Sequence, residues 1–114
     1  MFDRKSLNII FVCSKNKWRS PTAERVFAKD SGLNVRSAGT SGSAKRKVSV
    51  VDILWEDIIF VMEEKHKSRL KADFRKEKSD KKLYVLDITD DYKFMGPDLI
   101  DIMRSKVVPI IIQA

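Results

Sequence analysis

The stretch "CSKNKWRS" carries the residues of this chain that are best suited to chemistry. It spans residues 13–20 and contains the single cysteine, Cys13, followed by Arg19 six positions later and then by Ser20. A thiol attacks only as its thiolate, and the start of a helix, a nearby guanidinium and a hydroxyl donor all favour that anion. The spacing therefore predicts a nucleophilic sulfur below a phosphoryl group, with the forked guanidinium of Arg19 binding the phosphate oxygens.

The same stretch is predicted to form a phosphate-binding loop, because successive backbone N–H groups make a concave nest for an anion. Its members are Cys13, Ser14, Lys15, Asn16, Lys17, Trp18, Arg19 and Ser20. The loop differs from that of nucleotide hydrolases, since Gly-x-x-x-x-Gly-Lys is absent. A lone cysteine that ends a strand is more often a small buried apolar residue. The combination of cysteine, five residues, arginine, serine and proline at a strand-to-helix turn favours the reactive interpretation instead.

The elements that must position this loop alternate between strands and helices. Continuous apolar runs are typical of buried strands, and we expect strands at 7–13, 33–39, 57–62 and 81–87. Helices are predicted at 20–32, at 50–57, after Met62 and from Pro97. Ser20 is the expected N-cap of the first helix, and Pro109 is expected to end or kink the last. Helices between strands imply a parallel sheet with right-handed crossovers, so the predicted fold is a single α/β domain over 1–114, a three-layer sandwich with a four-stranded parallel sheet.

In such sheets ligands bind at the carboxyl ends of the strands. Both the cysteine loop and the acidic segment "DITDD", residues 87–91, follow predicted strands. We therefore expect a carboxylate of this segment to lie near the thiol.

Composition limits the partners. The chain has 114 residues, with 23 Lys and Arg against 16 Asp and Glu, a formal net charge of +7 that favours anionic partners. The basic segment 63–82 also contains acids, so a solvated helix face is favoured there over a nucleic-acid surface. No apolar run approaches the roughly 20 residues of a membrane span, and no signal peptide is recognisable, so we expect a cytoplasmic protein without a membrane partner. One cysteine and one histidine make a zinc site improbable, and no cofactor or metal is expected.

A family resemblance follows from these motifs. The segment "IIFVCSKNKWRSPTAERVF" resembles the signature of low-molecular-weight protein tyrosine phosphatases, and "SAGT" (37–40), "DIIFVM" (57–62) and "DDY" (90–92) are similar to further family segments. The resemblance, with gaps, covers residues 7 to 92 and suggests a short bacterial-type variant. It implies metal-independent hydrolysis of a phosphorylated protein or a small aryl phosphate through a phosphocysteine intermediate.

The resemblance also implies roles for individual residues. Cys13 would be the nucleophile, Arg19 would bind the phosphate and its transition state, and Asp90 would be the general acid that later activates water. Asn16 would brace the loop, and Ser20 would assist the thiolate.

The identity of the acid has two candidates. Asp87 ends the fourth predicted strand, as the aspartate of the family does, whereas Asp90 fits the Asp-x-Tyr spacing with Tyr92. We choose Asp90 and keep Asp87 as the alternative.

Several positions depart from the family. Lys15 replaces a usual glycine, and Trp18 stands where a second, protective cysteine is common. Part of the wall that grips an aromatic ring is missing, and Trp18 and Tyr92 are the candidates to rebuild it. His66 shares a helical stripe with Leu70 and is expected to be structural rather than catalytic.

Other functions compete with the phosphatase. An arsenate reductase of similar fold would need an external thiol, because the chain has no further cysteine. A phosphocysteine carrier of the sugar-transport type would need neither Arg19 nor Asp90. A non-catalytic module could bind phosphate in the same loop without hydrolysis, while its basic surface docks RNA or a phosphoprotein.

Overall fold

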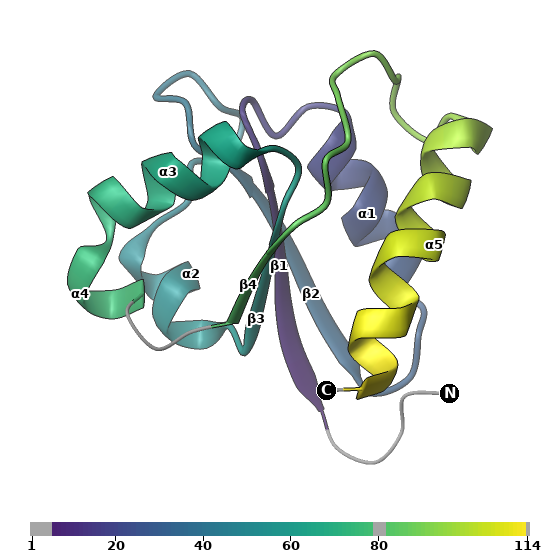
Figure 1. Ribbon diagram of the computed structural model, residues 1–114, viewed down its shortest axis with the longest axis horizontal. Coiled ribbons are helices and arrows are strands. Elements are labelled where there is room, and N and C mark those ends of the chain that lie inside the picture. Colours follow the sequence, from purple (N-terminus) through teal and green to yellow (C-terminus); the bar gives the residue numbers. More distant parts are fainter. Residues whose placement is uncertain (1–5, 79–81, 114) are drawn as a thin grey trace.

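Four parallel strands form the centre of the protein. The computed structural model describes residues 6–78 and 82–113. The strands are β1 (Leu7–Cys13), β2 (Leu33–Gly39), β3 (Ile58–Val61) and β4 (Lys82–Val85), in the order β2-β1-β3-β4 (Figure 1). The α/β fold with a four-stranded parallel sheet is therefore confirmed, and β1, which carries Cys13 at its end, is a central strand.

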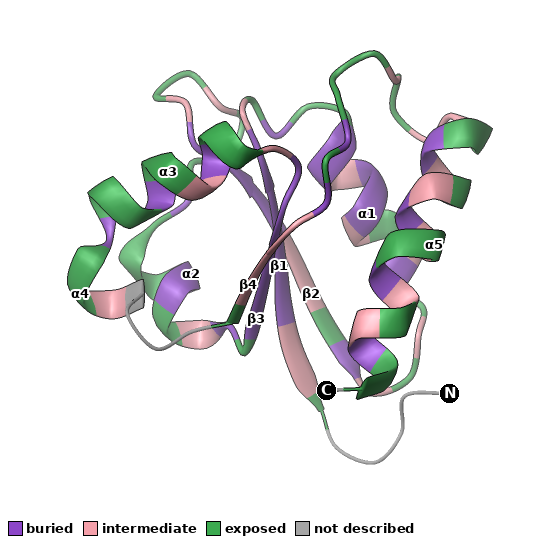
Figure 2. Ribbon diagram, in the orientation of Figure 1, coloured by how far each residue is buried: buried purple, intermediate pink, exposed green. Residues whose placement is uncertain are grey.

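Helices cover both faces of this sheet (Figure 1). One face is covered by α1 (Arg19–Phe27) and α5 (Pro97–Gln113), and the other by α2 (Val50–Trp55), α3 (Glu64–Asp73) and α4 (Arg75–Lys78). Side chains of β1 alternate between the two cores, with Phe11 and Cys13 on the α1 side and Ile10 and Val12 on the α3 side. Figure 2 shows that the buried residues of the helices face the sheet. Burial of each large apolar side chain contributes about 1.5–3 kcal/mol, which fixes the end of β1 in a rigid frame.

The first helix begins earlier than predicted. Its N-cap is Trp18, which makes no side-chain capping bond, so Ser20 lies inside the first turn and the prediction that it caps the helix is wrong. Ser20 is fully buried, and its hydroxyl is used by neighbours in the cysteine loop instead. The helix also ends at Phe27, and Gly32 enters β2 with a φ of 85°, a backbone conformation that glycine adopts at little cost.

The second and third helices follow their sequence signals. Ser49 and Asp52 form the predicted capping box at the start of α2. On α3, His66 and Leu70 are buried, in agreement with the predicted inward stripe.

The last helix continues past Pro109 to Gln113, so of the two expected effects of this proline, an end or a kink, the end is wrong. A proline inside a helix costs about 3 kcal/mol relative to alanine. The buried side chains of the helix recur every four residues, and they include Ile111 beyond the proline: Leu99, Met103, Val107 and Ile111. Packing of Ile111 against the sheet offsets the lost hydrogen bond. Within 6–78 and 82–113, no helix combines the length and apolar character needed to cross a bilayer.

Candidate active site

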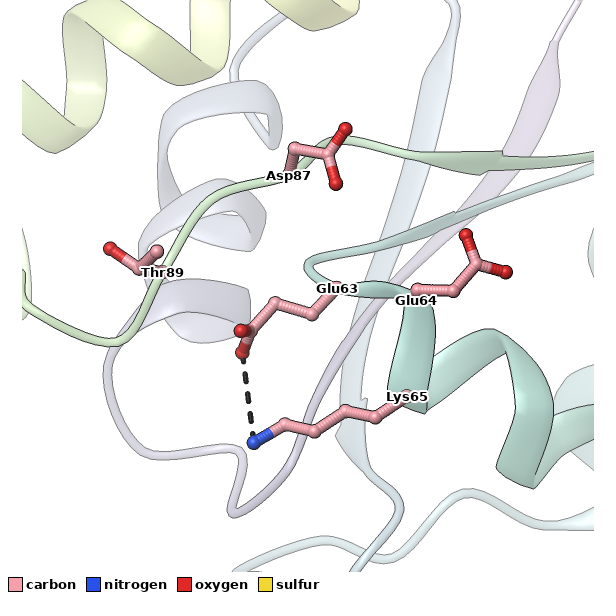
Figure 3. Close-up of a pocket in the computed structure, with 5 residues that line it drawn as sticks. All are labelled: Glu63, Glu64, Lys65, Asp87 and Thr89. Carbon is pink, nitrogen blue, oxygen red and sulfur yellow. Dashed lines mark ion pairs between the residues drawn. The ribbon is translucent and has the colours of Figure 1, made fainter.

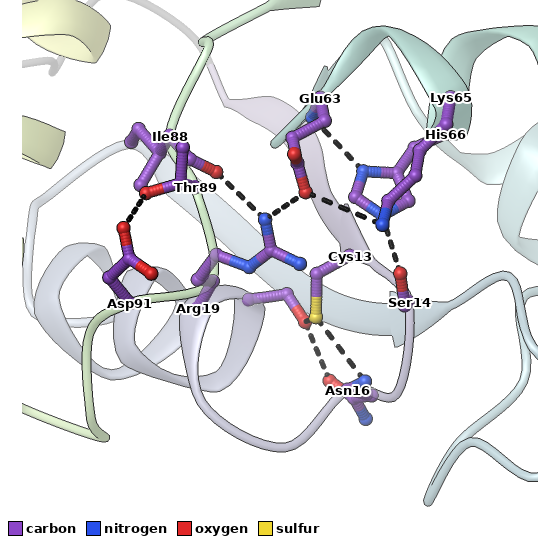
Figure 4. A network of polar contacts seen from close by, with 11 residues as sticks. Cys13, Ser14, Asn16, Arg19, Glu63, Lys65, His66, Ile88, Thr89 and Asp91 are labelled. Carbon is purple, nitrogen blue, oxygen red and sulfur yellow. Dashed lines mark hydrogen bonds and ion pairs between the residues drawn. The ribbon is translucent and has the colours of Figure 1, made fainter.

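The sulfur of Cys13 lies at the base of the loop between β1 and α1. The residue is only 3% exposed, its Sγ lies 3.0 Å from Ser20 Oγ, and the Asn16 backbone N–H donates to it at 3.3 Å (Figure 4). Ser20 Oγ also lies 2.9 Å from Asn16 Oδ1, to which it can donate. The single hydroxyl proton can therefore turn between the amide oxygen and the sulfur, and a thiolate would receive hydrogen bonds from both Ser20 and Asn16.

The backbone of the loop is held open by the segment that follows β2. The N–H groups of Thr40, Ser41 and Lys45 donate to the carbonyl oxygens of residues 13, 14 and 15, at 2.9, 2.9 and 3.0 Å. These bonds direct three carbonyl oxygens of the loop toward the segment after β2. Carbonyl oxygens that faced a bound anion would repel it. Asn16 has a φ of 55°, a left-handed conformation that asparagine tolerates better than most residues.

Gly39 lies directly behind this loop, at the end of β2. A Cβ atom at this position would lie 2.5 Å from the Ser14 carbonyl oxygen and 2.9 Å from the Asn16 nitrogen. Both distances are too short for real contacts. The close approach of β2 to the loop therefore requires the glycine of the "SAGT" segment.

Arg19 leaves the first turn of α1 and is nearly buried, at 5% exposure. Its Nη1 donates to Glu63 Oε1 at 2.6 Å and to the Ile88 carbonyl oxygen at 2.7 Å (Figure 4). The hydrogen bond from Arg19 holds the pKa of the Glu63 carboxyl below its usual value, so this carboxylate is charged near neutral pH.

His66 contacts the opposite end of the loop. The Glu63 backbone N–H donates to His66 Nδ1 at 3.0 Å, so Nε2 carries the proton and donates to Ser14 Oγ at 2.8 Å. Burial lowers the pKa of His66 to about 4, with a further contribution from the charge of Arg19, and the ring is neutral near pH 7.

A cavity of about 250 Å³ brings the main predicted residues together. Its lining residues are Cys13, Ser14, Lys15, Lys17, Trp18, Arg19 and Asp90. Asp90 comes from the loop after β4 and shares the cavity with the sulfur and the guanidinium. Asp87 does not line it. That residue has a φ of 55° and lines a neighbouring cavity of about 330 Å³ with Glu63, Glu64, Lys65 and Thr89 (Figure 3).

The N-terminal part of the chain matches a known family. Residues 8–53 match the family model described as low molecular weight phosphotyrosine protein phosphatase. This match agrees with the resemblance that the sequence shows, over the part of the chain that contains the cysteine loop. The matched residues run from β1 into α2 and contain the whole loop of residues 13–20. No curated protein matches the chain in sequence.

Solved structures show how widely the fold is shared. A mutant of the YwlE arginine phosphatase with a phosphorylated active-site serine is 20% identical, with a TM-score of 0.77 over 94% of this chain and 95% of that one. Wzb from Vibrio vulnificus, in complex with benzylphosphonate, is 18% identical, with a TM-score of 0.74 over 100% of both chains. A low molecular weight phosphotyrosine phosphatase from Vibrio cholerae O395 is 19% identical, with a TM-score of 0.68 over 95% of this chain and 96% of that one. The whole chain thus has the fold of low molecular weight phosphatases.

The positions that depart from the low molecular weight phosphatase pattern lie at the rim of the cavity. Trp18 is 41% exposed and lines it, with the Lys17 ammonium 5.5 Å from the centre of the indole ring. Lys15 donates from its Nζ to Ser43 Oγ at 2.5 Å. Tyr92 packs against the core on the α5 side and does not line the cavity, so of these two residues only Trp18 lies at the cavity.

Two residues beside the cysteine loop were missed or underrated from the sequence. In the sequence, Glu63 belongs to a mixed-charge run and His66 to the inward stripe of α3, and neither pattern predicts a contact with the loop. A usable signal existed for Glu63, because it follows β3 at the same sheet edge as the cysteine loop. Among residues 6–78 and 82–113, no three His, Cys, Asp or Glu side chains form a cluster that could hold a metal ion.

Proposed function

We propose that this protein is a metal-independent protein tyrosine phosphatase of the low molecular weight type, with a phosphorylated protein or a small aryl phosphate as substrate. The observation that carries the proposal is the shared cavity of Cys13, Arg19 and Asp90. A nucleophile, a phosphate-binding cation and a proton donor are the three groups that a double displacement on a phosphate ester requires. The Asn16 backbone N–H donates to the sulfur, and the Ser20 hydroxyl lies 3.0 Å from it and can turn to donate, so both support the thiolate that must attack.

The proposed reaction has two steps. In the first, the Cys13 thiolate attacks phosphorus, the bond from phosphorus to the ester oxygen breaks, and Asp90 protonates the departing phenol oxygen. In the second, the Asp90 carboxylate removes a proton from water, the oxygen attacks phosphorus, and the sulfur–phosphorus bond breaks to release phosphate and thiolate. Arg19 and the N–H groups of the loop bind the equatorial oxygens in both steps.

The charges around the cavity favour tyrosine over arginine as the phosphorylated residue. Lys15, Lys17 and Arg19 line the cavity together with a single acid, Asp90. A tyrosine leaves as a neutral phenol, and Trp18 offers an aromatic surface for its ring. An arginine leaves as a guanidinium cation, which the ammonium groups of Lys15 and Lys17 repel. The fold similarity to the arginine phosphatase makes phosphoarginine the second candidate, and two peptides of one sequence with the two phosphorylated residues distinguish them.

The first test is hydrolysis of a chromogenic aryl phosphate in the presence of a metal chelator. We expect turnover by the wild type, no turnover by Cys13→Ser, a fall of at least about 100-fold in kcat/KM for Arg19→Ala, and inhibition by vanadate. Equal rates for Cys13→Ser and the wild type would contradict the nucleophile assignment. A wild type that binds vanadate without turnover would instead be a phosphate-binding module. Reduction of arsenate with an added thiol, in the absence of ester hydrolysis, would favour the reductase.

The second test concerns the acid. Asp90→Asn and Asp87→Asn are compared on aryl phosphates whose leaving groups differ in basicity. We expect the loss with Asp90→Asn to grow as the leaving group becomes more basic, because such a group needs protonation more. Asp87→Asn should show a small loss that does not depend on the leaving group. The reverse pattern would assign the acid to Asp87.

A further inference from the structure

One side of the Arg19 guanidinium is already occupied before any phosphate binds. Both hydrogen bonds of Nη1 go to the protein, one to Glu63 Oε1 and one to the Ile88 carbonyl oxygen. Within the part of the chain that the structure describes, Nε and Nη2 donate no hydrogen bond. A guanidinium has five N–H donors in a rigid plane, so fixing one amino group fixes the direction of the remaining three donors. Those three donors remain for an anion.

A carboxylate beside an anion site needs compensation. Glu63 is ionised near neutral pH, and by itself its charge would repel a phosphate dianion. Glu63 Oε1 also forms an ion pair with Lys65 Nζ at 3.8 Å, drawn as a dashed line (Figure 3). Glu63, Arg19 and Lys65 together therefore carry one net positive charge, and the carboxylate can orient Arg19 without making the site negative.

The start of α3 contacts both ends of the cysteine loop. Glu63 holds Arg19 at the C-terminal end, and its backbone N–H holds His66, which donates to Ser14 near the N-terminal end (Figure 4). The two contacts originate within residues 63–66, one turn of chain. This turn therefore contacts the loop at two points, Arg19 and Ser14.

We propose that Glu63 is a positioning residue for the phosphate site. Its carboxylate fixes the guanidinium of Arg19 so that the free donors face the bound phosphate, and it does so from the same turn that holds Ser14 through His66. The proposal depends on the proposed phosphate-binding role of the loop. It predicts that loss of the carboxylate weakens anion binding, although a negative charge is removed from beside an anion site.

Two other roles for Glu63 make different predictions. If Glu63 competes with phosphate for Arg19, its removal would strengthen phosphate binding. If it only stabilises the fold, its removal would lower the melting temperature and leave the affinity of the folded protein unchanged.

The experiment measures inhibition by inorganic phosphate and by vanadate, together with kcat and KM for an aryl phosphate. Glu63→Ala removes the acceptor, whereas Glu63→Gln keeps an oxygen acceptor of the same shape without the charge. Glu64→Ala is the matched control, since Glu64 is exposed and its carboxylate pairs with Lys67. Because a hydrogen bond to a charged group is lost, we expect phosphate and vanadate inhibition constants to rise at least about 10-fold in Glu63→Ala. Glu63→Gln should lie between Glu63→Ala and the wild type, and Glu64→Ala should match the wild type.

The readouts separate this proposal from the proposed function. Unchanged or tighter phosphate inhibition in Glu63→Ala, at a temperature where the variant is folded, would overturn the positioning role while leaving the phosphatase intact. A wild type that neither hydrolyses aryl phosphate nor binds phosphate would overturn the proposed function and, with it, the positioning role. A fall in kcat without any change in the two inhibition constants would also contradict the proposal.

Discussion

At the scale of single residues, the shape of the cysteine loop depends on backbone conformation and side-chain size as much as on charge. Asn16 supplies a left-handed backbone position, and Ser20 supplies one hydroxyl proton that can serve either the amide of Asn16 or the sulfur of Cys13. Gly39 supplies the absence of a side chain, which lets β2 approach the loop. A residue of a different shape at any of these three positions would change the conformation of the loop or its hydrogen bonds.

Gly39→Ala should damage both stability and phosphate binding. The added methyl group would meet the Ser14 carbonyl oxygen and the Asn16 nitrogen, so the loop must shift, and overpacking of this kind costs about 1–3 kcal/mol. Chemical denaturation and the phosphate inhibition constant measure the two effects. Gly42→Ala is the control, because no atom lies within 4 Å of its added Cβ, and it should change stability by less than about 0.5 kcal/mol. A Gly39→Ala variant with normal phosphate binding would show that the loop tolerates displacement.

At the scale of elements, α3 is more than a cover for the sheet. Its first turn holds a neutral histidine against Ser14, its N-cap residue Glu63 holds a carboxylate against Arg19, and the same helix packs Leu70 into the core. The core contact fixes the helix axis, and the axis in turn places the two polar contacts. Changes in the protonation of His66 should therefore affect both folding and the loop.

The free energy of unfolding should fall with acid through the titration of His66. Its pKa is about 4 in the folded protein and about 6.5 for an unperturbed histidine, so the unfolded chain binds the proton more readily. The stabilisation is complete above about pH 6.5 and is lost as the pH falls towards 4, with a slope of at most about 1.4 kcal/mol per pH unit. Urea denaturation of the wild type and of His66→Gln between pH 7 and 4 measures it. The same slope in both proteins would show that other groups are responsible.

At the scale of the whole molecule, both the net positive charge and the position of the basic side chains affect the binding of anionic substrates. The net charge is +7, and Lys15 and Lys17 bring part of it to the rim of the cavity. Long-range attraction of this kind raises the rate of encounter with anionic substrates and weakens with salt. It predicts a preference for phosphotyrosine peptides with acidic neighbours.

The kcat/KM for such peptides should show whether the lysines at the rim of the cavity attract the substrate. We expect kcat/KM for an acidic phosphotyrosine peptide to exceed that for a neutral one, and to fall several-fold between 20 and 500 mM salt, roughly as screening of exposed charges requires. Lys17→Glu should remove most of the preference. Lys29→Glu changes the net charge equally at an exposed site after α1, away from the cavity, and should keep the preference. Equal losses in the two variants would indicate that only the total charge matters.

The sequence alone determined the strands, the parallel sheet and the cysteine loop, because these features depend on residues that are neighbours along the chain. An unbroken apolar run predicts a buried strand wherever it occurs, and the Cys-x5-Arg spacing lies within one loop. The family resemblance rests on the same contiguous residues.

The tertiary structure decided what depends on the path of the chain between distant elements. Glu63 and His66 meet Arg19 and Ser14 across 44 and 52 positions, which no local pattern encodes. The positive φ of Asp87 and the course of the following loop place Asp90, not Asp87, in the cavity of Cys13. Ser20 lost its expected capping role, and α5 continued past its proline, for one physical reason. Local propensities contribute about 1–3 kcal/mol each, and burial or a hydrogen bond formed elsewhere in the fold can outweigh them.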